Sequence, residues 1–375
     1  MIHGTNKGRR ASGPASRLWI PVRLVLAVVL VALLALVGVG CTTQDNTSSQ
    51  QQGSTDTSAN TTGNQGADTL APGSVPVRVA SLKGPTSIGL VDFMDKASNP
   101  DATSTLMGAY SFQISGTADE ILPSMVSGDL DIALVPANVA SVLYNRTNGG
   151  VTAISINTLG ALYVVSADAS ITSLQDLAGR TVLMTGKGTT PDYVMNYLLK
   201  QNGLDGKVDL EYKSEATELA AAVSADPTAI ALLPEPYVTA VTSKNPDLAV
   251  RLSLADEWQK LEGDQGGQLV AGVTLVRTAF LNQYPQVVQE FLSNQADSVA
   301  SVLADPAAAS QLVVSQGIID DAQVAQTAIP RCNLVCLEGS QMQTALSSYL
   351  QVLYAADPTS VGGTLPGTDF YYLGQ

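Results

Sequence analysis

From residue 75 onward, short apolar runs rich in Val, Ile and Leu alternate with segments of helical periodicity. This alternation is typical of βαβ units, in which neighbouring strands run parallel and a helix connects them. It constrains the fold more than any other feature of the chain. The expected strands are residues 77–82, 110–115, 131–135, 151–157, 161–166, 180–184, 208–212, 229–233 and 268–277. The pattern predicts an α/β fold with a mostly parallel sheet.

After residue 277 the apolar residues recur at helical spacing, so this tail is helical, has no sheet of its own and must pack on another part of the chain. The most economical arrangement returns it to the first set of βα units. We therefore expect two lobes around a ligand cleft, with residues 75–157 and 278–375 in lobe 1 and residues 158–277 inserted as lobe 2. The expected helices are residues 87–96, 138–144, 174–177, 192–200, 216–223, 284–303, 307–315, 321–328 and 340–354, and one that a Thr117/Glu120 capping box starts and Gly128 ends.

Two loops rich in Gly and Thr follow strands, one in each predicted lobe, and each opens a helix. A helix N-terminus presents unpaired backbone N–H groups and partial positive charge, and open α/β sheets bind ligands at the carboxyl ends of their strands. We expect both loops to contact one ligand, although the first could also be a plain helix cap. The candidates are Gly84, Pro85, Thr86 and Ser87 in the first loop and Gly186, Lys187, Gly188, Thr189 and Thr190 in the second.

Further candidates follow other strands. Asn138, after Pro136 and Ala137, could donate to and accept from a ligand or serve only as a helix N-cap. Glu235, between two prolines and near Tyr237, could pair with a cationic ligand or remain a solvated carboxylate. Lys83 and Lys187 would favour an anion, so the charge of the ligand stays open. The candidates in these loops and at the first crossover between lobes are Pro136, Asn138, Asn157, Thr158, Gly160, Glu235 and Tyr237.

Residues 1–40 have the pattern of an export signal: basic residues, then an uncharged run, then small residues before Cys41. The sequence before Cys41 resembles the lipobox of bacterial lipoproteins, which implies that Cys41 is lipidated. An uncleaved membrane anchor is the alternative. Residues 41–74, which begin with that cysteine, are small and polar and predict a flexible linker. Both interpretations tether the remainder to the extracytoplasmic face of the cell membrane.

Charge and rare residues exclude several functions. Residues 41–375 carry 14 basic and 33 acidic residues, a net charge of −19, which argues against binding nucleic acid or anionic lipid. The single histidine, His3, lies in the signal segment, so triad chemistry and histidine–metal chemistry are excluded for the remainder. Cys332 and Cys336 could form a disulfide in an oxidising compartment and make a poor zinc site. We expect no catalytic residue, no metal and no cofactor.

Four stretches resemble the solute-binding lipoproteins of ABC importers, a group that includes binding proteins for nitrate, alkanesulfonates, taurine and thiamine precursors. The stretches are LKGPTSIGL (82–90), SGDLDIALVPANVASVLY (127–144), SLQDLAGRTV (173–182) and TGKGTTPDYVMNYLLKQNGL (185–204). The tail stretch IPRCNLVCLEG (329–339) is similar to an element of one branch. The resemblance runs from about residue 75 to the end. It implies a two-lobed type II periplasmic-binding-protein-like fold that closes on its ligand.

The sequence therefore predicts a monomeric substrate-binding component of an ABC-type importer rather than an enzyme. It would capture a small polar organic solute, sulfonate-, nitrate- or taurine-like or thiamine-precursor-like, and deliver it to the permease and ATPase subunits. Two alternatives remain: an enzyme on the same fold that resembles menaquinone-pathway enzymes, and a ligand-sensing surface lipoprotein. Turnover of a substrate would favour the first alternative, and a neighbouring sensor kinase the second.

Overall fold

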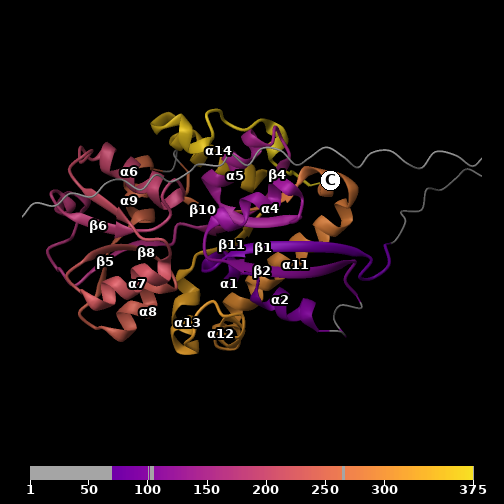
Figure 1. Cartoon of the computed structure of the whole chain (residues 1–375), viewed down its shortest axis with the longest axis horizontal. Helices are drawn as coiled ribbons and strands as arrows, with labels where there is room; N and C mark the ends of the chain where they lie inside the picture. The colour runs from indigo at the N-terminus through magenta and orange to yellow at the C-terminus, as the bar shows by residue number, and fades with distance from the viewer. Residues whose placement is uncertain (1–69, 100, 102–104, 264–266, 375) are drawn as a thin grey trace, which may run out of the picture. The chain divides into compact units, whose positions relative to one another are not determined.

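The computed structural model describes residues 70–99, 101, 105–263 and 267–374 (Figure 1). The export signal, the lipidation of Cys41 and most of the linker are predictions that lie outside the described residues. The described chain forms a mixed six-stranded sheet, a mixed five-stranded sheet and helices around both. This architecture confirms the predicted two-lobed α/β fold.

The six-stranded sheet has the order β11-β4-β10-β3-β1-β2. Strand β1 runs parallel to β2 and β3, whereas β10 runs antiparallel to both of its neighbours, β3 and β4, and β11 antiparallel to β4. The strands are β1 (Val75–Leu82), β2 (Gly108–Ser115), β3 (Ile132–Pro136), β4 (Val151–Leu159), β10 (Val270–Arg277) and β11 (Leu334–Leu337).

One expectation about this sheet is wrong. The expected second lobe, residues 158–277, includes β10, but β10 pairs inside the first sheet, because its apolar residues on both faces need the cover that only a central strand has. The tail adds one strand, β11, to the edge of the same sheet, in a stretch for which only helices were expected. The boundaries of the lobes otherwise stay a prediction.

The five-stranded sheet has the order β7-β6-β8-β5-β9. Strand β6 runs parallel to β7 and β8, and β5 runs antiparallel to β8 and β9. The strands are β5 (Leu162–Ser166), β6 (Thr181–Met184), β7 (Asp209–Tyr212), β8 (Ile230–Pro234) and β9 (Ala249–Ser253). Strand β9 was not expected, because its charged and polar residues interrupt the apolar run.

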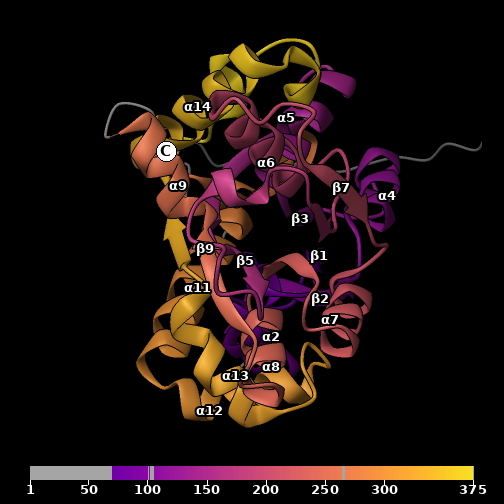
Figure 2. The ribbon, with the colours of Figure 1, turned by 90° about the vertical axis from the view of Figure 1, so that its left-hand side faces the viewer.

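Helices cover both faces of both sheets (Figures 1 and 2). Helices α5 and α14 pack on one face of the six-stranded sheet, and α2 and α11 contribute to the hydrophobic cluster on the other. The α-helices are α1 (Pro85–Ile88), α2 (Val91–Ser98), α4 (Leu122–Ser127), α5 (Ala137–Arg146), α6 (Thr190–Gln201), α7 (Ala216–Ala225), α8 (Tyr237–Lys244), α9 (Leu254–Glu262), α10 (Thr278–Gln283), α11 (Pro285–Ala304), α12 (Pro306–Ser315), α13 (Ala322–Ala328) and α14 (Gly339–Ala356). The 3₁₀ helices are η1 (Ala118–Glu120), η2 (Leu174–Leu177), η3 (Ile329–Arg331), η4 (Pro358–Val361) and η5 (Thr368–Phe370).

Two expected helix starts differ in detail. The helix expected over residues 87–96 is divided into α1 and α2 at Gly89 and Leu90. The predicted capping box does not form, because Thr117 makes no side-chain cap bond and Glu120 accepts the Gly116 N–H instead. Gly128 ends α4 in the left-handed conformation, as predicted, with φ 85°.

The tail packs on lobe 1 and also contacts two helices that pack beside the second sheet. Helix α11 contacts α2 and β11, and α14 contacts α5 and β4. In addition, α14 contacts α6, and α13 contacts α8. In the part of the chain that the structure describes, no single helix has the length and apolarity to cross a membrane, and α11 and α12 pass that test only as a pair bent by 116°.

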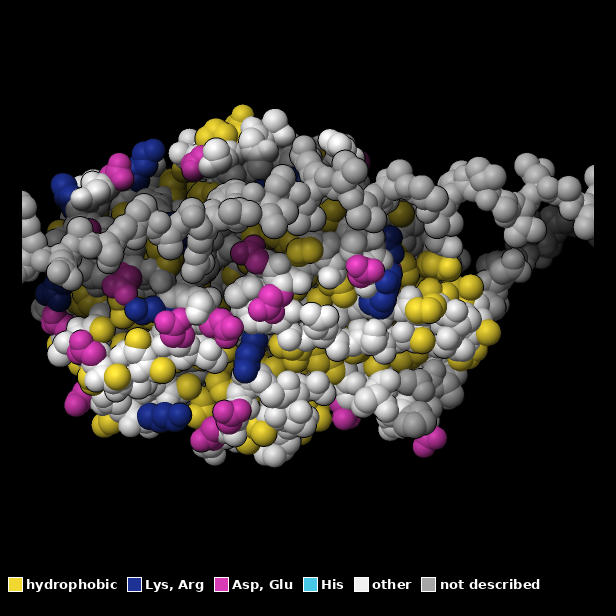
Figure 3. Space-filling view, in the orientation of Figure 1, with side chains coloured by type: hydrophobic (Ala, Val, Ile, Leu, Met, Phe, Trp, Pro, Cys, Tyr) yellow, Lys and Arg dark blue, Asp and Glu magenta, His cyan; other side chains and the backbone are white. Residues whose placement is uncertain are grey.

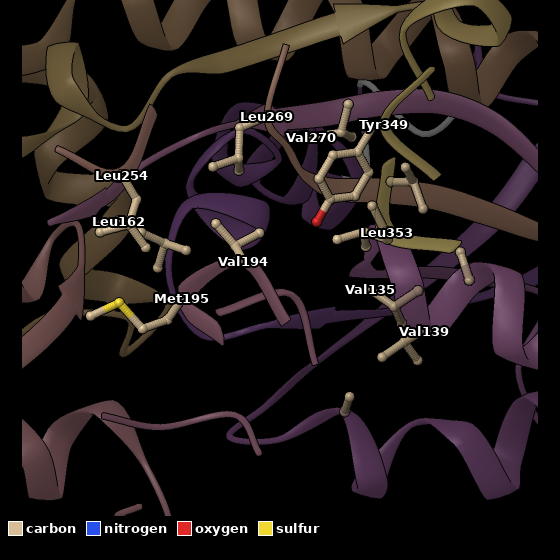
Figure 4. Close-up of a cluster of buried hydrophobic side chains, with 14 of the residues drawn as sticks. Val135, Val139, Leu162, Val194, Met195, Leu254, Leu269, Val270, Tyr349 and Leu353 are labelled. Carbon is tan, nitrogen blue, oxygen red and sulfur yellow. The ribbon is translucent and has the colours of Figure 1, made fainter. Parts of the chain in front are cut away.

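The largest hydrophobic cluster extends over both sheets (Figure 4). It joins Val135 of β3 and Val139 of α5 with Val194 and Met195 of α6, and Tyr349 of α14 lies in the same cluster. All of these side chains are at most 6% exposed. The two sheets therefore share one core.

Candidate functional site

A cavity of about 140 Å³ lies where strand ends of the two sheets meet. Strands β1, β3, β4 and β8 end at its wall, and β5, β10 and α6 begin there. It is lined by Leu82, Lys83, Pro85, Thr86, Pro136, Thr158, Ala161, Leu162, Thr190, Pro191, Pro234, Ala271 and Gly272. A larger hollow of about 960 Å³ lies between the starts of α11 and α14, away from these strand ends. The position at the strand ends makes the smaller cavity the candidate site.

Pro85 and Thr86 of the first Gly/Thr loop line the cavity. The hydroxyl groups of this loop are used within the turn, because Thr86 Oγ1 and Ser87 Oγ both donate to the Leu82 carbonyl, at 2.7 and 2.6 Å. The Thr86 methyl group therefore faces the neighbouring strand β10. Ser87 is fully buried and does not line the cavity, and Gly84, with φ 136°, faces the Glu235 carbonyl.

The second loop reaches the cavity only at the start of α6, through Thr190 and Pro191. Thr189 Oγ1 donates to the Gly186 carbonyl at 2.6 Å, and the Gly188 N–H donates to the Asp192 carboxylate at 2.7 Å. Lys187 Nζ lies 5.3 Å from the ring centroid of Tyr212, a cation–π contact outside the cavity lining. The Thr189 hydroxyl and the Gly188 N–H are thus used within the loop and the first turn of α6.

Asn138 is fully buried and does not line the cavity. Its amide nitrogen donates to the Gly188 carbonyl at 3.3 Å and the Ser360 carbonyl at 3.2 Å, and its oxygen accepts from Thr190 Oγ1 at 3.3 Å. It is not the N-cap of α5, a position that Pro136 takes. Asn138 therefore connects lobe 1 to the second loop.

Of the three predicted crossover residues, only one lines the cavity. Thr158 lines the cavity and donates to Asn157 Oδ1 at 3.0 Å. Asn157 does not line the cavity, and its amide nitrogen donates to Thr274 Oγ1 at 3.1 Å. Gly160 does not line the cavity, but Ala161 beside it does.

Glu235 and Tyr237 are buried and do not line the cavity. The Glu235 carboxylate accepts from the N–H and the hydroxyl of Thr239, each at 3.0 Å, and so holds the start of α8. Burial raises the pKa of Glu235, and burial also raises the pKa of Tyr237 to about 12. The expectation of a solvated carboxylate is wrong, and its role as a ligand contact stays a prediction.

Cys332 and Cys336 are free thiols in the structure, which does not contain the disulfide that the sequence left possible. Cys332 is fully buried in the cluster of α12, α13 and β11, and its thiol donates to the Ala328 carbonyl. Cys336 in β11 has its thiol next to Glu338. The two side chains therefore have different surroundings.

Sequence reasoning missed the contribution of β10, Ala271 and Gly272, because this strand was assigned to the wrong sheet. A Cβ atom on Gly272 would lie 2.5 Å from Asn157 Oδ1 and 3.1 Å from the Thr86 methyl carbon. A glycine inside a strand often marks such a close approach, and that signal could have found it. Ala161, Leu162, Pro191 and Pro234 carry no polar signal and could be found only from the structure.

Lys83 is the only charged residue among those that line the cavity. Four of the others are prolines, which have no N–H and form stiff walls. Figure 3 shows acidic side chains spread over one face of the molecule with Lys and Arg among them, so an anion depends on local donors. The lining holds no pair of titratable groups for acid–base chemistry, and the arrangement can enclose a small molecule.

The model of the family of periplasmic substrate-binding proteins of phosphonate ABC transporters matches residues 109–264. Solved structures are similar over most of the chain. An ABC transporter protein from Parabacteroides distasonis is 21% identical with a TM-score of 0.65, over 80% of this chain and 99% of that chain. The alkanesulfonate-binding protein of Xanthomonas axonopodis pv. citri, bound to MOPS, is 13% identical with a TM-score of 0.61, over 80% and 96%.

The aliphatic sulphonate-binding protein of Escherichia coli is 14% identical with a TM-score of 0.63, over 80% of this chain and 92% of that chain. No curated protein matches the chain. The structural likenesses show the fold, which is that of the periplasmic binding proteins.

Residues 109–264 therefore match the family of periplasmic substrate-binding proteins of ABC transporters, the group that the sequence resemblance implied. This family and this fold are those of binding proteins rather than enzymes. The description of the family is of periplasmic proteins that bind the substrate of an ABC transporter.

Proposed function

We propose that this protein captures a short-chain organic anion, a phosphonate or a sulfonate, between its two sheets and delivers it to an ABC permease. The observation that carries the proposal is the cavity at the meeting strand ends, with Lys83 as its single charged lining residue. The ammonium group would pair with the anionic head, and the proline, alanine and leucine walls would contact the short carbon chain. The phosphonate family match and the sulfonate-binding neighbours support the same class of solute.

The size of the cavity limits the solute. Sites for drug-sized ligands usually measure about 300–1,000 Å³. At about 140 Å³, this cavity suits a solute with few non-hydrogen atoms. Methyl and ethyl phosphonates and sulfonates, taurine and nitrate fit this limit better than thiamine or its pyrimidine precursor.

The proposal also includes the expectations about the N-terminal segment. Residues 1–40 would direct export, and a lipid on Cys41 would anchor the protein to the membrane. Residues 42–74 would then give the binding unit reach toward the permease. We propose that the protein acts as a monomer in this role.

Thermal unfolding of the full chain tests the proposal against a panel of methyl- and ethylphosphonate, methane- and ethanesulfonate, taurine, nitrate, thiamine and its pyrimidine precursor. A ligand at a hundred times its Kd stabilises the folded state by about 2.7 kcal/mol. We expect a saturable shift with at least one of the short anions. A shift with thiamine or its precursor alone, or with none of the panel, contradicts the proposed ligand class.

Two lysine variants identify the site. Lys83→Gln removes the charge from the cavity wall, and a lost charge-assisted hydrogen bond raises the Kd about ten- to hundredfold. Lys187→Gln is the matched control, because its ammonium group lies over Tyr212 and outside the lining. Equal effects of the two substitutions would contradict the placement of the anion in this cavity.

A further inference from the structure

The Tyr349 hydroxyl is the one buried side-chain polar atom without a hydrogen-bond partner in the part of the chain that the structure describes. Tyr349 lies on α14 in the C-terminal tail and is fully buried. Figure 4 shows its hydroxyl pointing from α14 into the cluster that it shares with Val194 of α6. A buried hydroxyl without a hydrogen-bond partner lowers the stability of the folded state, so Tyr349 at this position requires an explanation.

The start of α6 lies next to this hydroxyl. Helix α14 packs against α6, and the Thr190 side chain lies within interaction range of the Tyr349 oxygen without completing a hydrogen bond. Thr190 also lines the cavity and donates to Asn138 Oδ1 at 3.3 Å, a long bond. One threonine thus lies between the cavity, α5 and α14.

The Thr190 hydroxyl can serve both neighbours at once. A hydroxyl has one proton and two acceptor lone pairs. The proton goes to Asn138, so a lone pair remains for the proton of Tyr349. A shift of the start of α6 toward α14 would complete that bond.

We propose that Tyr349 is a positioning residue for ligand binding, which donates to Thr190 when a solute in the cavity draws the start of α6 toward α5 and α14. This inference rests on the proposed function, because Thr190 and Pro191 of α6 form the wall that the solute would contact. Pairing of the Tyr349 hydroxyl then favours the closed arrangement of the two lobes. The free energy that is recovered appears as ligand affinity.

The test is Tyr349→Phe in the full chain, with ethylphosphonate and ethanesulfonate as probes. Without a probe, we expect the melting temperature to be equal to or higher than that of the wild type, because the variant lacks the unpaired hydroxyl. With a probe, we expect the Kd to rise about fivefold, the typical value of one hydrogen bond. Tyr354→Phe is the matched control, five residues further along α14, and should change neither quantity.

Each other outcome overturns the inference. A lower melting temperature of Tyr349→Phe without a probe would mean that the hydroxyl is already paired and only structural. An unchanged Kd, with wild-type binding intact, would remove Tyr349 from ligand binding and leave the proposed function standing. Failure of the wild type to bind either probe would remove the proposed function for these solutes, and the inference with it.

Discussion

At the scale of the residue, the candidate site consists of close contacts more than of free polar groups. The hydroxyls of Thr86, Ser87 and Thr189 all donate to carbonyl groups of their own loops. These loops therefore expose mainly apolar surface to the cavity, and their hydroxyl oxygens can act there only as acceptors. Gly272 allows this packing, because any side chain there would meet Asn157 and Thr86.

Gly272→Ala should weaken ligand binding strongly and destabilise the fold moderately. The added methyl group meets Asn157 Oδ1, and overpacking of this kind typically costs about 1–3 kcal/mol. Calorimetric titration with the solute found in the panel measures the loss of affinity, and urea denaturation measures the loss of stability. Gly116→Ala is the control, since its methyl group would meet only the end of the flexible Glu215 side chain. Unchanged affinity in Gly272→Ala would contradict the site assignment.

At the scale of the element, one buried carboxylate connects three strands. Asp131, which precedes β3, accepts from Arg78 of β1 at 2.8 Å and from Arg277 at the end of β10. Burial alone would raise the pKa of Asp131, but the hydrogen bonds from Arg78 and Arg277 outweigh it and lower the pKa below its ordinary value. This group of residues ties β10 to the sheet from which the sequence pattern had separated it.

Asp131→Asn should destabilise the protein by about 3 kcal/mol, at the lower end for a broken buried pair because Arg78 is partly exposed. Because the pKa is lowered in the folded state, the stabilisation by Asp131 is fully present above the ordinary value of 3.8 and is lost as the pH falls through the lower folded value. Urea denaturation at pH 7 and pH 3 measures both effects, with exposed Asp129→Asn as control. A gap between variant and wild type that widens at low pH would contradict this assignment.

At the scale of the whole molecule, the two sheets share one buried hydrophobic cluster, which predicts that they unfold together (Figure 4). Val135 lies on β3 of the six-stranded sheet, and Val194 lies on α6, which follows β6 of the five-stranded sheet. Both residues belong to the same buried cluster. Val165, in contrast, lies in a cluster that belongs to the second sheet alone. A substitution at Val194 therefore tests the coupling between the lobes, whereas one at Val165 tests the stability of the second lobe alone.

Scanning calorimetry of the full chain should show one transition for the described unit, with equal calorimetric and van't Hoff enthalpies. Val194→Ala should lower the stability by about 2 kcal/mol and weaken the coupling between lobes, so that the van't Hoff enthalpy falls below the calorimetric one. Val165→Ala should cost a similar amount without that change in the enthalpy ratio. Two separate transitions in the wild type would contradict the shared core.

Short-range features of this protein could be read from the sequence. The alternation of strands and helices, the loop at residues 83–87 and the left-handed end of α4 at Gly128 all depend on neighbours within a few residues. For that reason the α/β class and two loops near the cavity were predictable. The cavity itself contains the predicted Pro85, Thr86, Pro136, Thr158 and Thr190.

The remaining features depend on residues far apart in the chain. The sheet to which β10 belongs is set by pairing with β3 and β4, more than a hundred residues earlier. Asn138 turns away from the cavity because its partners are Gly188 and Ser360, 50 and 222 residues away. A sequence pattern specifies which groups must be buried or paired, but the partner of a buried strand or amide is selected by competition among distant groups, and that competition is settled only when the chain has folded.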